Sequence, residues 1–263
     1  MHRFFVGELA LRGVDAGATL SLPEAVARQT RSVLRIAPGE QMVLFDNSGY
    51  ELIATVTASS RTSVDVEVVE RRAGEKESPV RVVLCQGLLK SARFEWVLEK
   101  GTELGVSVFA PILCRRSMAG LEDAGPAKIQ RWQRILQEAT EQCGRARVPE
   151  LLPIRPLLHA LNDIPPGALA LMPWEEEHTQ TLHAALQAAR TQSIPAEAKE
   201  ITVVLFIGPE GGLMAEEVTL AQRHGAIPVT LGSRILRAET AALATVANVI
   251  YELEPLFSPD PCA

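Results

Sequence analysis

The segment FIGPEGGL, residues 206–213, places three glycines and a proline around a single carboxylate, Glu210. It closes an apolar run that begins at Ile201, and glycines directly after a strand indicate that the backbone must come close to another group. Loops at the carboxyl ends of strands are also where α/β proteins bind ligands. The segment is therefore a candidate binding loop. The alternative is a tight connection in which Gly211 and Gly212 adopt positive φ angles.

Two further loops follow expected strands: LMPWEEE, residues 171–177, and LGSRILRAETAA, residues 231–242. None of the three loops has the glycine spacing of a dinucleotide fingerprint, or the lysine and hydroxyl of a phosphate loop. Glycines, apolar side chains and free backbone amides instead suit a flat, uncharged base. Glu239 and Thr240 also fit an ordinary first helical turn, where they complement the helix dipole. Arg237 does not, because a cation at a helix start is unfavourable unless an anion lies nearby.

The composition excludes several classes of protein. The chain has 263 residues, 47% of them hydrophobic, which is enough for one large domain or two ordinary ones. A net charge of −6 argues against coating of nucleic acid by bulk electrostatics, although a basic patch on one face stays compatible with it. The four cysteines lack the paired spacing of a zinc site or a disulfide framework, and the histidines show no metal-ligand spacing. Without a signal sequence or a membrane-length apolar run, we expect a soluble cytoplasmic protein that uses no metal.

The first part of the chain predicts a small β domain over residues 1–73. Residues 41–60 read as two strands joined by an Asp-Asn-Ser-Gly hairpin turn, and residues 63–72 alternate as a half-buried strand does. A short helix opened by proline is expected within residues 23–34. The charged segment AGEKESP, residues 73–79, has the composition of a linker.

The rest of the chain, residues 74–263, alternates strands and helices. Because its strands are apolar on both faces, the pattern predicts an α/β domain with a mainly parallel sheet covered by helices. The expected strands are residues 80–89, 106–114, 168–172, 201–208 and 226–232. The expected helices are residues 91–104, 126–144, 178–190, 214–225 and 237–254.

The motifs IGPEGGL and LGSRILRAETAALA closely resemble those of the bacterial 16S ribosomal RNA uridine N3-methyltransferases, a family of the SPOUT superfamily. Residues 88–117 resemble the first strand–helix–strand of that family, and residues 131–151 resemble its next segment. The opening MHRFFV and residues 33–35 resemble its PUA-like RNA-binding domain. One difference is Arg28-Gln29-Thr30, where many relatives carry a histidine.

The resemblance implies a PUA-like β-barrel at residues 1–73 and, at residues 74–263, a SPOUT domain with a C-terminal deep trefoil knot. Knots are very rare in proteins, so periodicity alone does not predict one. The cofactor implied is S-adenosylmethionine, bound in the knot without a metal, and the family is a homodimer whose site is completed across the subunit interface. The cofactor-binding residues implied are Leu171, Met172, Gly208, Pro209, Glu210, Gly211, Gly212, Leu231, Gly232, Ile235, Leu236, Arg237, Thr240 and Ala241.

The chemistry of N3 methylation suggests catalytic candidates. The methyl group of a sulfonium is already activated, so the enzyme mainly aligns acceptor, methyl carbon and sulfur. The proton on uracil N3 must leave, and the resulting charge spreads onto the carbonyl oxygens, where a fixed cation stabilises it. Arg237 is the first candidate cation and Arg145 the second, and Glu141 or Glu239 is the candidate proton acceptor. Salt bridges and helix-surface charge are the alternatives for these side chains.

Five arginines make the first 35 residues locally basic and are candidate RNA contacts: Arg3, Arg12, Arg28, Arg31 and Arg35. A solvated helix face is the alternative, and the family resemblance favours RNA. The expected partner is 16S ribosomal RNA, within the small ribosomal subunit. The rival functions are a methyltransferase of the same fold acting on a ribose 2′-hydroxyl or a transfer RNA base, and a non-catalytic RNA-binding assembly factor.

Overall fold

A computed structural model of the chain describes residues 1–74, 77–118, 120, 125–192 and 200–256. The chain divides into two compact units. The first comprises residues 1–77 and 137–148, and the second comprises residues 78–136 and 149–263. Part of the expected linker, residues 75–76, and the proline-rich tail from residue 258 lie outside the described residues.

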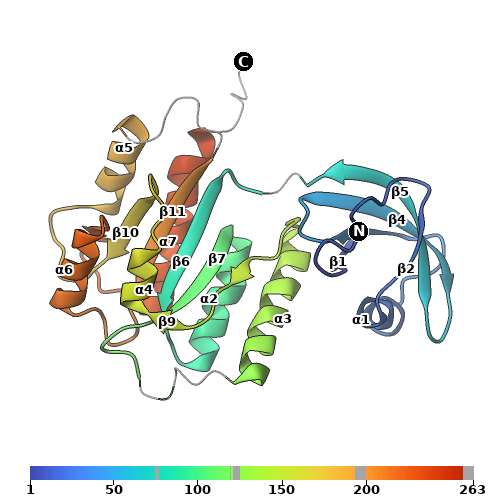
Figure 1. Cartoon of the computed structure of the whole chain (residues 1–263), viewed down its shortest axis with the longest axis horizontal. Coiled ribbons are helices and arrows are strands. Elements are labelled where there is room, and N and C mark those ends of the chain that lie inside the picture. The colour runs from blue at the N-terminus through green and yellow to red at the C-terminus, as the bar shows by residue number, and fades with distance from the viewer. Residues whose placement is uncertain (75–76, 119, 121–124, 193–199, 257–263) are drawn as a thin grey trace. The chain divides into compact units, whose positions relative to one another are not determined.

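The first unit is built on a five-stranded sheet in the order β1-β3-β4-β5-β2 (Figure 1). Its strands are β1 (His2–Phe5), β2 (Thr19–Ser21), β3 (Gln41–Phe45), β4 (Tyr50–Ser59) and β5 (Val64–Ala73). The pairs β3–β4, β4–β5 and β2–β5 are antiparallel, whereas β1 pairs with β3 in parallel. The expected hairpin joins β3 to β4, and Asn47 and Gly49 supply its positive φ angles of 64° and 87°.

The core of the first unit lies on one face of this sheet. Alternate residues of β5 are buried, as the period of two predicts: Val64, Val66 and Val68. Helix α1 (Glu24–Arg28) continues into a π-helical turn, η1 (Gln29–Val33). Its apolar side packs into the same cluster.

The later segment of the first unit contains the end of helix α3 (Pro126–Cys143) and the loop that follows it. The backbone N–H of Phe5 donates to Glu141 Oε1 at 3.1 Å, and the N–H of Val148 donates to Asn47 Oδ1 at 2.8 Å. Residues 137–148 therefore complete the first unit, although they lie far from it in sequence.

The second unit contains a seven-stranded sheet in the order β12-β10-β11-β6-β7-β8, with β9 paired to β7. Every strand pair in it is parallel among the described residues, so the expected mainly parallel α/β fold is confirmed. The strands are β6 (Val80–Gly87), β7 (Val106–Leu113), β8 (Glu150–Leu151), β9 (Arg155–Pro156), β10 (Leu169–Pro173), β11 (Ile201–Ile207) and β12 (Ile227–Val229).

Helices cover this sheet, and the central strand β11 is buried from Val203 to Ile207. An apolar cluster packs α4 (Leu157–Asn162) and α6 (Ala215–Arg223) against strand residues such as Met172 and Phe206. Helix α7 (Ala238–Leu253) packs against β6 and β11, and it contacts α2 (Ser91–Glu103) and α5 (Leu182–Gln192). A short 3-10 turn, η2 (Glu254–Leu256), follows α7.

Candidate functional site

A cavity of about 550 Å³ lies in the second unit, at the carboxyl ends of β10, β11 and β12. Because parallel strands end at the same edge of a sheet, the loops that follow them meet there. Each of the three loops identified in the sequence contributes to the cavity wall. The lining consists of residues 173–175, 207–213 and 230–238, together with Arg93, His178 and Ala241.

Most of the expected cofactor residues line this cavity. They are Gly208, Pro209, Glu210, Gly211, Gly212, Leu231, Gly232, Ile235, Leu236, Arg237 and Ala241. Leu171, Met172 and Thr240 are not among the lining residues. Leu171 and Met172 are fully buried inside β10, so the first loop contributes from Pro173 onwards.

The glycines of the 208–212 loop are needed first for contact with the chain itself. A Cβ added to Gly211 would lie 2.9 Å from Arg116 Cβ and 3.0 Å from Arg116 O. Gly212 has a φ of 73°, and its added Cβ would meet Glu175 Oε1. The expected positive φ is thus present at Gly212, whereas at Gly211 the close approach of residue 116 excludes a side chain.

The end of β6 is a second support for this loop that the sequence motifs did not reveal. A Cβ on Gly87 would lie only 2.5 Å from the backbone nitrogen of Pro209. The neighbouring Gln86 is buried, and its Nε2 donates to the carbonyl oxygens of Gly87 at 2.9 Å and Gly208 at 3.4 Å. Strand periodicity predicted a strand here but gave no signal that its last residues hold a loop from 120 residues further along the chain.

Charged groups gather at the start of two helices beside the cavity. Arg237 is the N-cap residue of α7 and lines the cavity. Glu210 Oε1 accepts a hydrogen bond of 3.0 Å from the backbone N–H of Lys90, the N-cap residue of α2. Arg93 lies between Glu210 and Glu239, at 3.6 Å from each carboxylate. Both carboxylates are thus paired with Arg93, a lining cation that the motifs missed.

The cavity fits an adenosine-containing cofactor. Its volume is within the range of about 300–1,000 Å³ usual for small-molecule pockets. Aliphatic walls come from Ile207, Leu231 and Leu236. Trp174 also lines the cavity, and its buried indole Nε1–H has no acceptor among the described residues.

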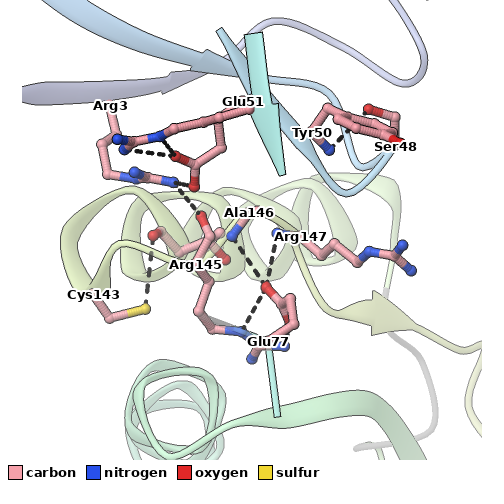
Figure 2. Close-up of polar contacts among 11 residues, drawn as sticks. Arg3, Ser48, Tyr50, Glu51, Glu77, Cys143, Arg145, Ala146 and Arg147 are labelled. Carbon is pink, nitrogen blue, oxygen red and sulfur yellow. Dashed lines mark hydrogen bonds and ion pairs between the residues drawn. The ribbon is translucent and has the colours of Figure 1, made fainter. Parts of the chain in front are cut away.

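Two of the catalytic candidates lie in the first unit and are already engaged there. Arg145 is buried, and its Nη2 lies 2.9 Å from Glu77 Oε2 (Figure 2). Glu77 Oε1 also accepts the backbone N–H groups of Ala146 and Arg147, at 3.1 and 3.0 Å. Glu141 accepts the N–H of Phe5. These contacts hold the loop after α3. In the second unit, Arg237 lines the cavity, and Glu239 follows it in the first turn of α7 without being a lining residue.

The five arginines expected to contact RNA differ in availability. Arg12, Arg28 and Arg35 are exposed, whereas Arg31 is half-buried and donates to Ser60 O at 3.1 Å. Arg3 is used inside the unit, where it pairs with Glu51 (Figure 2).

Glu51 explains why Arg3 is held. Its carboxylate is only 4% exposed, and it pairs with Arg3 and with Arg72. Burial by itself raises the pKa of Glu51, but the hydrogen bonds and charges of Arg3 and then Arg72 outweigh burial and lower that pKa below its ordinary value of 4.5. Arg3 further donates to the carbonyl oxygen of Arg145 at 3.0 Å.

No described helix is both long and apolar enough to cross a membrane. Within the same residues, no three or more His, Cys, Asp or Glu side chains are grouped so as to hold a metal ion.

Comparison with known proteins identifies the family to which the chain is similar. A family model described as an RNA methyltransferase domain matches residues 76–250. The ribosomal RNA small subunit methyltransferase E of Bacillus subtilis is 30% identical over 257 residues, which are 97% of this chain and 98% of that protein. A relative of the same name from Synechocystis is 31% identical over 90% of this chain and 74% of its own length.

A solved structure agrees with these relatives. The crystal structure of a ribosomal RNA small subunit methyltransferase E from Neisseria gonorrhoeae, bound to S-adenosyl methionine, matches with a TM-score of 0.81 and 30% identity. The match covers 95% of this chain and 97% of that one. Since the family model spans well over half of the chain and relatives align along most of it, this chain belongs to the RNA methyltransferase domain family.

Proposed function

We propose that this protein transfers the methyl group of S-adenosylmethionine to N3 of a uridine in the 16S ribosomal RNA of the small subunit. The observation that carries the proposal is the cavity at the ends of β10, β11 and β12, which gathers three loops of the expected cofactor site. Relatives named for methylation of small subunit ribosomal RNA, and a related structure bound to this cofactor, support the substrate class. The choice of N3 of uridine rests on the motif resemblance.

The proposal includes the finer architecture. Residues 74–263 form a SPOUT domain whose C-terminal part is a deep trefoil knot, and residues 1–73 form a PUA-like barrel that binds RNA. The knot rests on the motif resemblance, as the choice of N3 does. The five-stranded, mostly antiparallel sheet of the first unit supports the barrel. The active form is a cytoplasmic homodimer, with each site completed across the subunit interface.

The chain's own residues would act mainly by positioning and by charge. When bound, S-adenosylmethionine supplies a sulfonium methyl group that needs no metal to activate it. The 208–212 loop holds the cofactor together with Leu231, Gly232, Ile235 and Leu236. Arg237 stabilises the charge that develops on the uracil carbonyl oxygens as the N3 proton leaves. Glu239, two residues after Arg237, is assigned as the acceptor of that proton, since its Oε2 has no hydrogen-bond partner among the described residues.

Recognition of RNA falls to the first unit. Exposed Arg12, Arg28 and Arg35 contact phosphates, with Arg31 beside them. Arg3 contributes indirectly, because it holds Glu51 and the loop at Arg145 in place. Arg145 and Glu141 have partners inside this unit, so they rank behind Arg237 and Glu239 as catalytic residues.

The direct test uses the purified protein, labelled S-adenosylmethionine and small ribosomal subunits from a strain that lacks the enzyme. Nucleoside analysis is expected to place the label on N3 of a single 16S uridine. Label on a ribose or on transfer RNA would keep the methyltransferase and replace the substrate. Cofactor binding without transfer to any RNA would instead favour the assembly factor.

A further inference from the structure

Arg93 joins two carboxylates that come from different loops of the cavity. Its Nη1 lies 3.6 Å from Oε1 of Glu210, in the loop after β11. Its Nε lies 3.6 Å from Oε1 of Glu239, in the first turn of α7. The three side chains are 40%, 21% and 14% exposed, so the group is partly shielded from water. One cation therefore bridges the two segments that form most of the cavity wall.

The place of Arg93 in its helix is unusual. It lies in the first turn of α2, after the N-cap residue Lys90, where the helix dipole disfavours a positive charge. The backbone N–H of Lys90 donates to the same Glu210 oxygen at 3.0 Å. Glu210 thus receives both a helix N-terminal amide and a guanidinium, and the paired carboxylates offset the unfavourable position of Arg93.

Loss of the two ion pairs of Arg93 would leave two carboxylates unneutralised beside the cavity. Without Arg93, Glu210 and Glu239 would be two carboxylates beside one cavity, and like charges in a partly shielded site repel each other. Glu210 would keep the amide of Lys90, whereas Glu239 would lose its only ion pair among the described residues. The start of α7, which also carries Arg237, would then be free to shift relative to the 208–212 loop.

We propose that Arg93 is a positioning residue that couples the 208–212 loop to the start of α7 and thereby sets the affinity for the cofactor. This inference rests on the proposed function, since it takes S-adenosylmethionine as the ligand of the cavity. The alternative is direct binding of the cofactor's carboxylate by Arg93. The two differ in a measurable way, because a positioning residue also acts on a ligand that has no carboxylate.

The experiment measures calorimetric affinity for S-adenosylmethionine and for decarboxylated S-adenosylmethionine. Arg93→Gln is expected to weaken the binding of both ligands by about threefold to tenfold. This is the lower part of the range of interaction energies for coupled residues in one network. Arg93→Lys, which keeps the charge, is expected to recover most of the loss. Glu239→Gln removes one of the repelling charges. The double variant Arg93→Gln/Glu239→Gln is therefore expected to bind no more weakly than Arg93→Gln alone.

The matched control is Arg131→Gln. Arg131, on α3, pairs with Glu95, on the same helix α2 as Arg93, at 2.6 Å. This ion pair is shorter than those of Arg93, and neither of its residues lines the cavity. The affinity of the Arg131→Gln variant for both ligands is expected to equal that of the wild type. If Arg93→Gln does not fold, as judged by circular dichroism, Arg93→Met, which also removes the charge, and the Glu239→Gln cycle built on it carry the test.

Three results would overturn the inference: wild-type affinity in Arg93→Gln, a loss confined to the ligand with a carboxylate, or fully independent effects of Arg93→Gln and Glu239→Gln. The proposed function fails separately. A wild-type protein that binds the cofactor normally but methylates no RNA would refute the function and leave the role of Arg93 in binding intact. A wild type that does not bind the cofactor would refute both.

Discussion

The two charged clusters of this protein differ in geometry and burial. In the first unit, Glu51 lies 2.5 Å from Arg3 and 3.1 Å from Arg72, and Arg145 lies 2.9 Å from Glu77. The side chains of Glu51 and Arg145 are 4% and 7% exposed. In the second unit, both ion pairs of Arg93 are 3.6 Å long, and its side chain is 40% exposed.

This difference separates a structural cluster from a site that admits a ligand. Short, buried pairs leave a charge uncompensated when one partner is removed, so they contribute mainly to folding. Longer pairs at the wall of a cavity contribute little to folding, yet they fix the shape that a ligand meets. Substitutions in the first cluster should therefore lower the stability of the fold and leave cofactor affinity unchanged. Substitutions in the second cluster should lower cofactor affinity and leave stability nearly unchanged.

The largest expected effect on stability is that of Glu51→Gln. Removing this carboxylate leaves the buried guanidinium of Arg3 without its charge partner, which costs about 3 kcal/mol in the free energy of unfolding. Urea denaturation measures the loss, and calorimetry is expected to show unchanged affinity for the cofactor. Glu95→Gln is the control. Its partner Arg131 is 66% exposed, so loss of this ion pair costs at most about 0.5 kcal/mol. Equal costs in the two variants would contradict the distinction between the clusters.

The depressed pKa of Glu51 predicts how stability depends on pH. A carboxyl group with a lower pKa in the folded state contributes stability above its ordinary pKa of 4.5, and this contribution is lost as the pH falls through the folded value. Urea midpoints measured from neutral pH to below 4.5 should fall less steeply in Glu51→Gln than in the wild type. Parallel curves would mean that Glu51 is not the group that titrates.

Arg237→Ala tests the catalytic side of the comparison. The loss of a cation that stabilises developing negative charge is expected to lower kcat by about 100-fold. The cofactor is held by the loops, so its affinity should change far less. Single-turnover methyl transfer to small ribosomal subunits measures the rate, and Arg234→Ala, an exposed neighbour in the cavity wall, is the matched variant. Full turnover in Arg237→Ala would remove this residue from the mechanism.

Gly87→Ala tests the support beneath the cofactor loop. An added Cβ would lie 2.5 Å from the backbone nitrogen of Pro209. A side-chain rotation cannot relieve a clash with backbone, so the 208–212 loop must shift. We expect cofactor affinity to fall by about tenfold, or 1.4 kcal/mol. Gly125→Ala is the control, since no atom lies within 4 Å of its added Cβ. Unchanged affinity in Gly87→Ala would show that the loop tolerates displacement.

The sequence predicted the parallel sheet well, because the apolar runs of β6, β7, β10 and β11 are each buried on both faces. It also predicted the two glycine-containing loops of the cavity, since glycine and arginine at strand ends are local signals. Leu171 and Met172 stay predictions, because both are buried in β10 and neither is among the residues that line the cavity.

What the sequence did not predict is set by long-range contact. Nothing local to Arg93 indicates that Glu210 and Glu239 will flank it, more than a hundred residues later. The same holds for Glu77, which binds the loop at Arg145 although α2 and β7 lie between the two in the sequence. Helix periodicity over residues 126–144 likewise gave no sign that the end of α3 groups with the first unit.

The smallest expected effect is that of single exposed arginines of the first unit. Arg28 is exposed on α1, so Arg28→Ala should leave the free energy of unfolding unchanged. Loss of one phosphate contact should weaken binding to 16S fragments by only a few-fold and should reduce the salt dependence of binding by about one unit of slope. Filter binding at several salt concentrations measures both quantities. Arg3→Ala should differ in kind, because Arg3 holds the buried carboxylate of Glu51, so its loss should lower stability at every salt concentration. If Arg28→Ala destabilised the fold as much as Arg3→Ala, exposed and paired arginines would not be separable in this unit.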